Sequence, residues 1–123
     1  MSQNITDAEL EIMRVLWVNN KAMTLAELCT ELTQTKDWNK STIQTLVGRL
    51  RGKGIIEPLD KYGAAQYVPL ITEDEYILAE GKAVIKKFGS AKTLALAMVR
   101  NGHLSDSDIE ELREYFKMCG EGR

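Results

Sequence analysis

Residues 39–54, NKSTIQTLVGRLRGKG, combine an apolar stripe with a face of small and polar side chains. Asn39 is placed to cap the start of a helix, and Gly54 is placed to end it in the left-handed conformation. Four apolar residues follow the i, i+3, i+4, i+7 spacing of one buried helix face: Ile43, Leu46, Val47 and Leu50. The pattern therefore predicts an amphipathic helix over residues 40–53.

The opposite face of this helix carries the residue types that contact nucleic acid. Small residues permit close approach, hydroxyl and amide groups reach base edges or phosphate, and a guanidinium pairs with guanine or phosphate. This face consists of Ser41, Thr45, Gly48 and Gly52, flanked by Gln44 and Arg49. A solvated helix face has a similar composition, but each glycine costs roughly 1 kcal/mol relative to alanine in a helix interior. Two glycines here indicate that another molecule comes close.

The elements around this helix are marked by local signals. Capping boxes at Thr6–Glu9, Thr24–Glu27 and Thr72–Glu75, with a weaker one at Ser105–Asp108, predict helices that begin near residues 7, 25, 73 and 106. A shorter helix is predicted to begin after Ser90. Residues 55–59 and 64–70 predict two short strands around a turn at 60–63. The chain is therefore predicted to be mainly α with a small β-hairpin, and three helices before a hairpin form a winged helix-turn-helix.

In that arrangement the helix 40–53 enters the major groove of double-stranded DNA and the hairpin contacts the backbone. The predicted DNA-binding residues are Lys40, Ser41 and Thr42 at phosphate, Gln44, Thr45 and Arg49 at bases or the groove edge, Gly48 for close approach, and Lys61 and Tyr62 at the wing. The net charge is −2, but five cations between residues 36 and 53 face a single anion, Asp37. A nearly neutral chain can thus present phosphate-binding charge on one side.

Residues 71–123 are predicted to form a helical dimerisation region that follows a DNA-binding domain over residues 1–70. Three short helices cannot bury all their large apolar side chains among themselves, and a symmetric partner would cover them. The predicted interface residues are Val84, Ile85, Leu94, Met98, Ile109, Leu112 and Phe116.

Composition argues against several other classes of protein. The chain has 123 residues and lacks any apolar run near the ~20 residues of a membrane span. Cys29 and Cys119 lie far apart without a CxxC partner, and the first residues do not form an export signal. No nucleophile–base pair or phosphate-binding glycine loop is readable. We therefore expect a cytoplasmic, non-enzymatic protein without a cofactor.

Several motifs, in order, resemble the BlaI/MecI/CopY family of bacterial repressors. They are TDAELEIMRVLW at 6–17, DWNKSTIQTLVGRL at 37–50, Lys53-Gly54, Gln66-Tyr67 and LSDSDIEEL at 104–112. The resemblance covers nearly the whole chain. It implies a homodimeric winged-helix repressor that binds inverted-repeat operators upstream of resistance genes.

The sequence departs from both branches of that family in how repression would end. The Asn-Phe bond that is cleaved in the β-lactam-responsive repressors falls at Ala97-Met98 here. The copper-responsive repressors carry a C-terminal CxCxxxxCxC box, whereas this chain has Cys119 alone, and one thiol per subunit makes a poor Cu(I) site. Two alternatives stay open: a copper-sensing repressor that uses Cys119, and a helical protein-interaction module that does not bind DNA.

Overall fold

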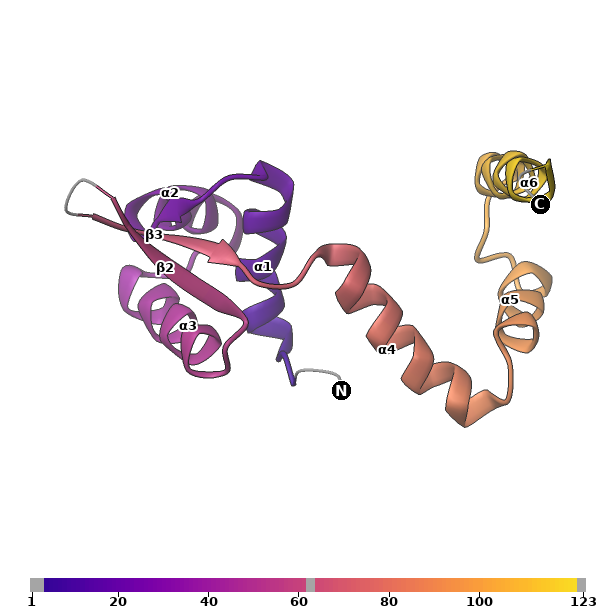
Figure 1. Ribbon diagram of the computed structural model, residues 1–123, viewed down its shortest axis with the longest axis horizontal. Coiled ribbons are helices and arrows are strands. Elements are labelled where there is room, and N and C mark those ends of the chain that lie inside the picture. The colour runs from indigo at the N-terminus through magenta and orange to yellow at the C-terminus, as the bar shows by residue number, and fades with distance from the viewer. Residues whose placement is uncertain (1–3, 62–63, 122–123) are drawn as a thin grey trace. The chain divides into compact units, whose positions relative to one another are not determined.

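The computed structural model describes residues 4–61 and 64–121 (Figure 1). The first part contains α1 (Asp7–Asn19), β1 (Met23–Thr24), α2 (Leu25–Lys36), α3 (Lys40–Gly52), β2 (Ile56–Lys61) and β3 (Ala64–Pro69). Three further helices follow: α4 (Glu73–Phe88), α5 (Ala91–Arg100) and α6 (Asp106–Glu121). This order confirms the predicted fold class, a mainly helical chain with a winged helix-turn-helix at its N-terminal end.

The helices begin where the capping signals placed them. In α1 the Thr6 hydroxyl accepts from the Glu9 N–H at 3.2 Å, and the Glu9 carboxylate accepts from the Thr6 N–H at 2.9 Å. Thr24 and Glu27 repeat this reciprocal pair at the start of α2. Such caps satisfy backbone N–H groups that have no partner within the helix, so a few neighbouring residues specify where each helix begins.

The sheet has one more strand than the predicted hairpin. Its antiparallel order is β1-β3-β2, because Met23 pairs with Tyr67 and Thr24 with Gln66. The prediction of two strands was therefore incomplete, because it did not include β1. Pro58 lies in the edge strand β2, where its missing N–H does not interrupt a ladder on both sides.

A single apolar core holds the three N-terminal helices and the sheet together. The predicted stripe of α3 is fully part of it, since Ile43 and Leu50 are 0% exposed and Leu46 and Val47 at most 5%. The other buried apolar residues are Ile12, Met13, Leu16, Met23, Leu28, Leu32, Ile55 and Ile56. Burial of this stripe orients α3, because it commits one face to the core and leaves the other in solvent.

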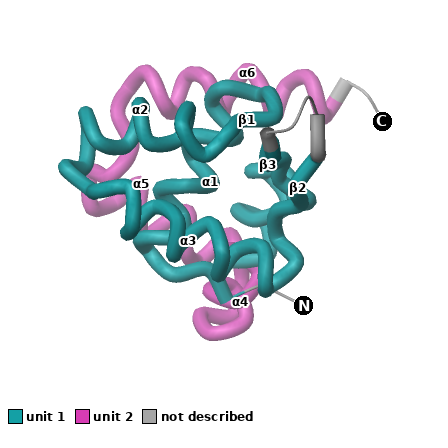
Figure 2. Tube along the Cα trace, turned by 90° about the vertical axis from the view of Figure 1, so that its left-hand side faces the viewer, with its two compact units in different colours: residues 1–80 teal, residues 81–123 magenta. Residues whose placement is uncertain are grey.

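The chain divides into two compact units, residues 1–80 and 81–123 (Figure 2). The first unit holds the core just described, together with the first two turns of α4. In the second unit, none of the residues whose side chains the structure describes is buried. No helix in the described part of the chain is long and apolar enough to span a bilayer.

Candidate nucleic-acid interface

Helix α3 exposes every one of its residues that the sequence predicts to contact DNA. Asn39 caps the helix by accepting a hydrogen bond from the Thr42 N–H at 2.8 Å. The exposed residues are Lys40, Ser41, Thr42, Gln44, Thr45, Gly48 and Arg49. The structure brings them together on one helix face while leaving their contacts with DNA to be tested.

The N-terminal end of α3 is suited to an anion. Its first turn, like that of α5, contains no acidic residue, whereas the first turns of α1, α2, α4 and α6 all contain at least one. Helix N-termini carry a partial positive charge and unpaired backbone N–H groups, which acidic side chains ordinarily satisfy. Here Lys40 adds a positive charge at the same end, so a phosphate would find both partners there.

The exposed face in the middle of α3 has small side chains, and its two glycines have a low helix propensity. The Thr45 hydroxyl donates to the Ser41 carbonyl at 3.0 Å, so its oxygen remains available as an acceptor. A Cβ built at Gly48 or Gly52 would meet no atom of the rest of the protein within 4 Å. No internal packing therefore requires glycine at either position.

The cations of the basic segment fall into two groups. Lys36 pairs with Glu11 at 3.6 Å, and Lys53 pairs with Glu9. Lys40, Arg49 and Arg51 form no ion pair with any described residue. Arg51 was not among the predicted DNA contacts, although it is one of the five cations between residues 36 and 53 that indicated phosphate binding. The positive charge available to a partner is thus concentrated at both ends of α3.

The structure describes the predicted wing contacts, Lys61 and Tyr62, only in part. Lys61 is the last residue of β2 and pairs with Ala64 in the ladder. Tyr62 lies outside the described residues, and the side chain of Lys61 is likewise not described. Their contact with the DNA backbone stays a prediction.

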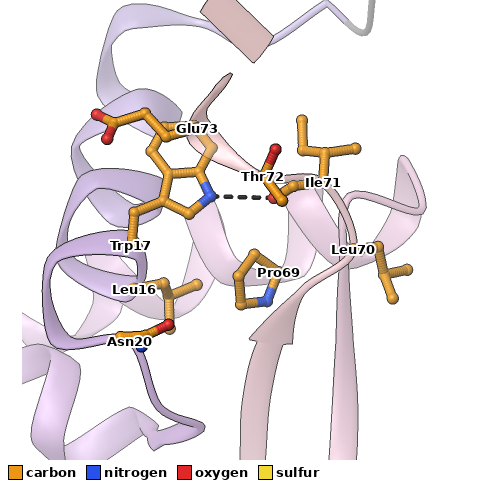
Figure 3. Close-up of a pocket in the computed structure, with 8 residues that line it drawn as sticks. All are labelled: Leu16, Trp17, Asn20, Pro69, Leu70, Ile71, Thr72 and Glu73. Atoms are coloured by element: carbon orange, nitrogen blue, oxygen red, sulfur yellow. Dashed lines mark hydrogen bonds between the residues drawn. The ribbon is translucent and has the colours of Figure 1, made fainter. Parts of the chain in front are cut away.

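A cavity of about 310 Å³ lies in the first unit, where β3 leads into α4 (Figure 3). The Trp17 indole N–H donates to the Ile71 carbonyl at 3.0 Å, and the ring packs against Tyr76 with centroids 5.9 Å apart. Burial raises the pKa of Tyr76, with help from the nearby charges of Glu80 and Asp7. These contacts hold the start of α4 on α1.

The apolar residues of the second unit remain in contact with solvent. Phe116 is 69% exposed, Leu112 42% and Met98 41%, while Val84 is also exposed and Ile85, Leu94 and Ile109 are half-buried. A groove of about 320 Å³ brings three of the predicted interface residues together with three that were not predicted, Val99, Leu104 and Arg113. The three predicted residues are Ile109, Leu112 and Phe116.

The two cysteines do not belong to a metal site within the described residues. Cys119 is exposed and Cys29 is half-buried, and both are free thiols. Within the described residues, no three His, Cys, Asp or Glu side chains are grouped so that they could hold a metal ion.

A family model and two characterised proteins match most of the chain. A family model described as penicillinase repressor matches residues 5–118. The chain is 34% identical over 110 residues to the penicillinase repressor of Bacillus licheniformis, which covers 88% of this chain and 85% of that protein. It is 34% identical over 111 residues to the methicillin resistance regulatory protein MecI of Staphylococcus aureus (strain N315), with 89% of each chain covered.

Two solved structures match about three fifths of the chain. The DNA-binding domain of the repressor BlaI aligns with a TM-score of 0.54 and 36% identity, covering 62% of this chain and 94% of that one. The monomeric form of Bacillus licheniformis BlaI in complex with the blaP half-operator aligns with a TM-score of 0.53 and 37% identity, covering 59% and 88%.

Proposed function

The chain belongs to the penicillinase repressor family, and we propose that it represses transcription by binding an operator in double-stranded DNA through α3. The observation that carries this proposal is the exposed face of α3. It joins an acid-free N-terminus, two glycines without internal packing and three cations outside any described ion pair, on a helix whose other face is fixed in the core. The BlaI complex with a half-operator supports the same docking, since that protein shares the fold and 37% of its aligned residues.

The residue roles follow from position along α3. Lys40, Ser41 and Thr42 bind phosphate at the helix N-terminus. Gln44, Thr45 and Arg49 meet base edges in the major groove, with Gly48 allowing close approach. Lys61 and Tyr62 bind backbone phosphates at the wing.

We propose further that two copies bind an inverted repeat, with residues 1–70 on DNA and residues 71–123 holding the dimer. The apolar surface of α4–α6 supports this, because each large side chain moved out of water stabilises the dimer by roughly 1.5–3 kcal/mol. Tethering makes the second half-site contact intramolecular, so affinity rises without any new base contact.

The test begins by letting the full chain select duplexes from a randomised pool. Affinity for the selected duplex is then measured against salt concentration by fluorescence anisotropy. A DNA-binding repressor gives a steep slope, since each neutralised phosphate contributes about −0.9 to the slope of log K against log salt. If no duplex is enriched and the chain instead binds a protein helix with an affinity that does not depend on salt, the alternative function as a helical protein-interaction module is favoured.

A second measurement tests the assembly. Sedimentation of the full chain at micromolar concentration is expected to give a dimer, and a symmetric selected sequence is expected from the pool. A monomer that selects only half-sites would refute the dimeric form of the proposal while leaving DNA binding intact.

A further inference from the structure

Glu9 differs from the other capping residues of this chain in being completely buried. It occupies the third helical position of a capping box, as Glu27 does in α2 and Glu75 in α4. The Glu27 side chain is 41% exposed and Glu75 is exposed, whereas Glu9 is 0% exposed. Glu27 and Glu75 show that a capping box works at the surface. Capping alone therefore does not account for the burial of Glu9.

The buried carboxylate is held from two directions. Its Oε1 accepts from the Thr6 N–H at 2.9 Å and from the Lys53 amine at 2.5 Å. The same amine donates to the Asn4 carbonyl at 2.6 Å. The other carboxylate oxygen, Oε2, is buried without a hydrogen-bond partner among the described residues. A buried charge is costly unless it is paired, so the contact with Lys53 is the one that makes this position tenable for Glu9.

The pKa of Glu9 is consistent with this arrangement. Burial by itself raises the pKa, but the hydrogen bonds and charge of Lys53 and Thr6 outweigh it and leave the pKa below the ordinary glutamate value. Glu9 is therefore anionic at neutral pH, and the contact is a true ion pair.

Lys53 lies where the pair acts on α3. It is the C-terminal cap of that helix, and its backbone N–H donates to the carbonyls of Arg49 and Arg51. Gly54 follows with φ of +75° and turns the chain away. The pair thus joins the end of α3 to the first turn of α1, 44 residues earlier in the sequence.

The rest of the α1–α3 contact has a different character. It belongs to a core of apolar side chains such as Ile12, Ile43 and Leu50. Apolar burial is strong but non-directional, so it resists separation of two helices better than rotation or sliding. A hydrogen-bonded ion pair has one favourable geometry and specifies the register at its end of the helix.

We propose that Glu9 and Lys53 form a positioning pair that sets how α3 is presented to DNA, with Lys53 committed to Glu9 rather than to a phosphate. This inference rests on the proposed function, in which α3 reads the operator. It assigns a positioning role to Glu9, a buried residue of α1 that does not itself contact DNA, and it leaves Lys53 unavailable to a phosphate.

The test uses the full chain and four variants: Glu9→Gln, Lys53→Met, the double variant and the matched control Glu27→Gln. Glutamine retains the oxygen that accepts from the cap N–H, so both single Gln variants keep their capping boxes and only Glu9→Gln loses a buried ion pair. Affinities for the duplex selected by the wild-type chain and for a shuffled duplex are measured at a temperature where circular dichroism shows each variant fully folded.

We expect Glu9→Gln and Lys53→Met each to lower the ratio of selected to shuffled affinity by about tenfold, the weight of one well-aligned base contact. The double variant is expected to lose no more than either single variant, because the two residues act as one unit. Glu27→Gln is expected to have the affinity ratio of the wild type. Lys53→Met is expected to have the salt slope of the wild type. A residue that only stabilises the fold would leave the ratio unchanged in folded protein.

Three results would overturn the proposal: a folded Glu9→Gln variant with wild-type discrimination, losses that multiply in the double variant, or a salt slope that falls by about one phosphate in Lys53→Met. If Glu9→Gln does not fold, Lys53→Met decides the question through the same ratio and slope. If the wild-type chain itself prefers no duplex, the proposed function fails first, and that outcome is distinct from all three.

Discussion

Substitutions at Gly48 are expected to change the stability of the fold and the affinity for DNA in opposite directions. It lies in the middle of α3, its backbone φ is that of an ordinary helix, and a Cβ there would meet nothing within 4 Å. Replacing it with alanine removes the conformational entropy cost of glycine and is expected to stabilise the chain by about 1 kcal/mol. For a unit of this size, that corresponds to a rise in melting temperature of roughly 4–8 °C.

The effect on DNA binding is expected to have the opposite sign. If α3 lies in the major groove with Gly48 against the DNA, added carbon atoms occupy space that the duplex needs. A methyl group in Gly48→Ala should weaken binding slightly, and Gly48→Leu should weaken it by about 1–3 kcal/mol, as overpacking does in a close-packed contact. Both variants should be at least as stable as the wild type.

The two effects are measured separately, by thermal unfolding and by anisotropy titration of the selected duplex. Gly81→Ala in α4 serves as the control, because a Cβ there also meets nothing within 4 Å and Gly81 is not among the proposed DNA contacts; sedimentation verifies that this variant still dimerises, since Gly81 lies in the proposed dimerisation region. It should gain stability and keep its affinity. A stabilised Gly48→Leu variant that binds DNA as tightly as the wild type would refute the argument that glycine serves close approach.

Four further predictions test the other parts of the site. Arg49→Ala should weaken operator binding by ~1–3 kcal/mol with an unchanged melting temperature, and wild-type affinity in a gel-shift titration would remove Arg49 from the interface. Leu112→Asp should convert the dimer to a folded monomer in sedimentation and weaken operator binding by orders of magnitude; a dimer that survives would place the interface elsewhere. The chain should resist the activated sensor protease of β-lactam-responsive relatives, since Ala97-Met98 replaces the cleaved bond, and a fragment ending at Ala97 in mass spectra would contradict this. Because the pKa of Glu9 is lowered on folding, its stabilisation is present above the ordinary glutamate pKa of about 4.3 and is lost as pH falls through the lower folded value. In urea unfolding measured from about pH 7 down to about pH 3, the free energy of unfolding should therefore fall less below about pH 4 in Glu9→Gln than in the wild type.

Local signals account for what the sequence predicted correctly. Thr6, Thr24 and Asn39 begin their helices through contacts only three residues away, so a short window of sequence contains all the information. The buried stripe of α3 was equally readable, because helical spacing alone determines which residues share a face.

The features that the sequence did not predict depend on distant residues. Strand β1 has only two residues, too few for a periodic pattern, and it exists because β3 lies beside it more than 40 residues later. Lys53 was counted with the other cations of residues 36–53, since its partner Glu9 is 44 residues away and has the sequence context of an ordinary cap.

Helix α3 and helices α4–α6 both differ from what the stability of an isolated chain requires, and they differ in opposite ways. In α3 the departure is a deficit: side chains are missing at Gly48 and Gly52, four residues apart on the exposed face, although the fold has room for them and the helix would be more stable with them. Helices α4 and α6 contain one such glycine each, Gly81 and Gly120. In α4–α6 the departure is an excess: large apolar side chains are present, although no described one is buried. A rigid polar surface that must come close explains the deficit, and an apolar surface of the same shape explains the excess. DNA has the first property and a second copy of the chain has the second, and this is why we propose one of these partners for each half.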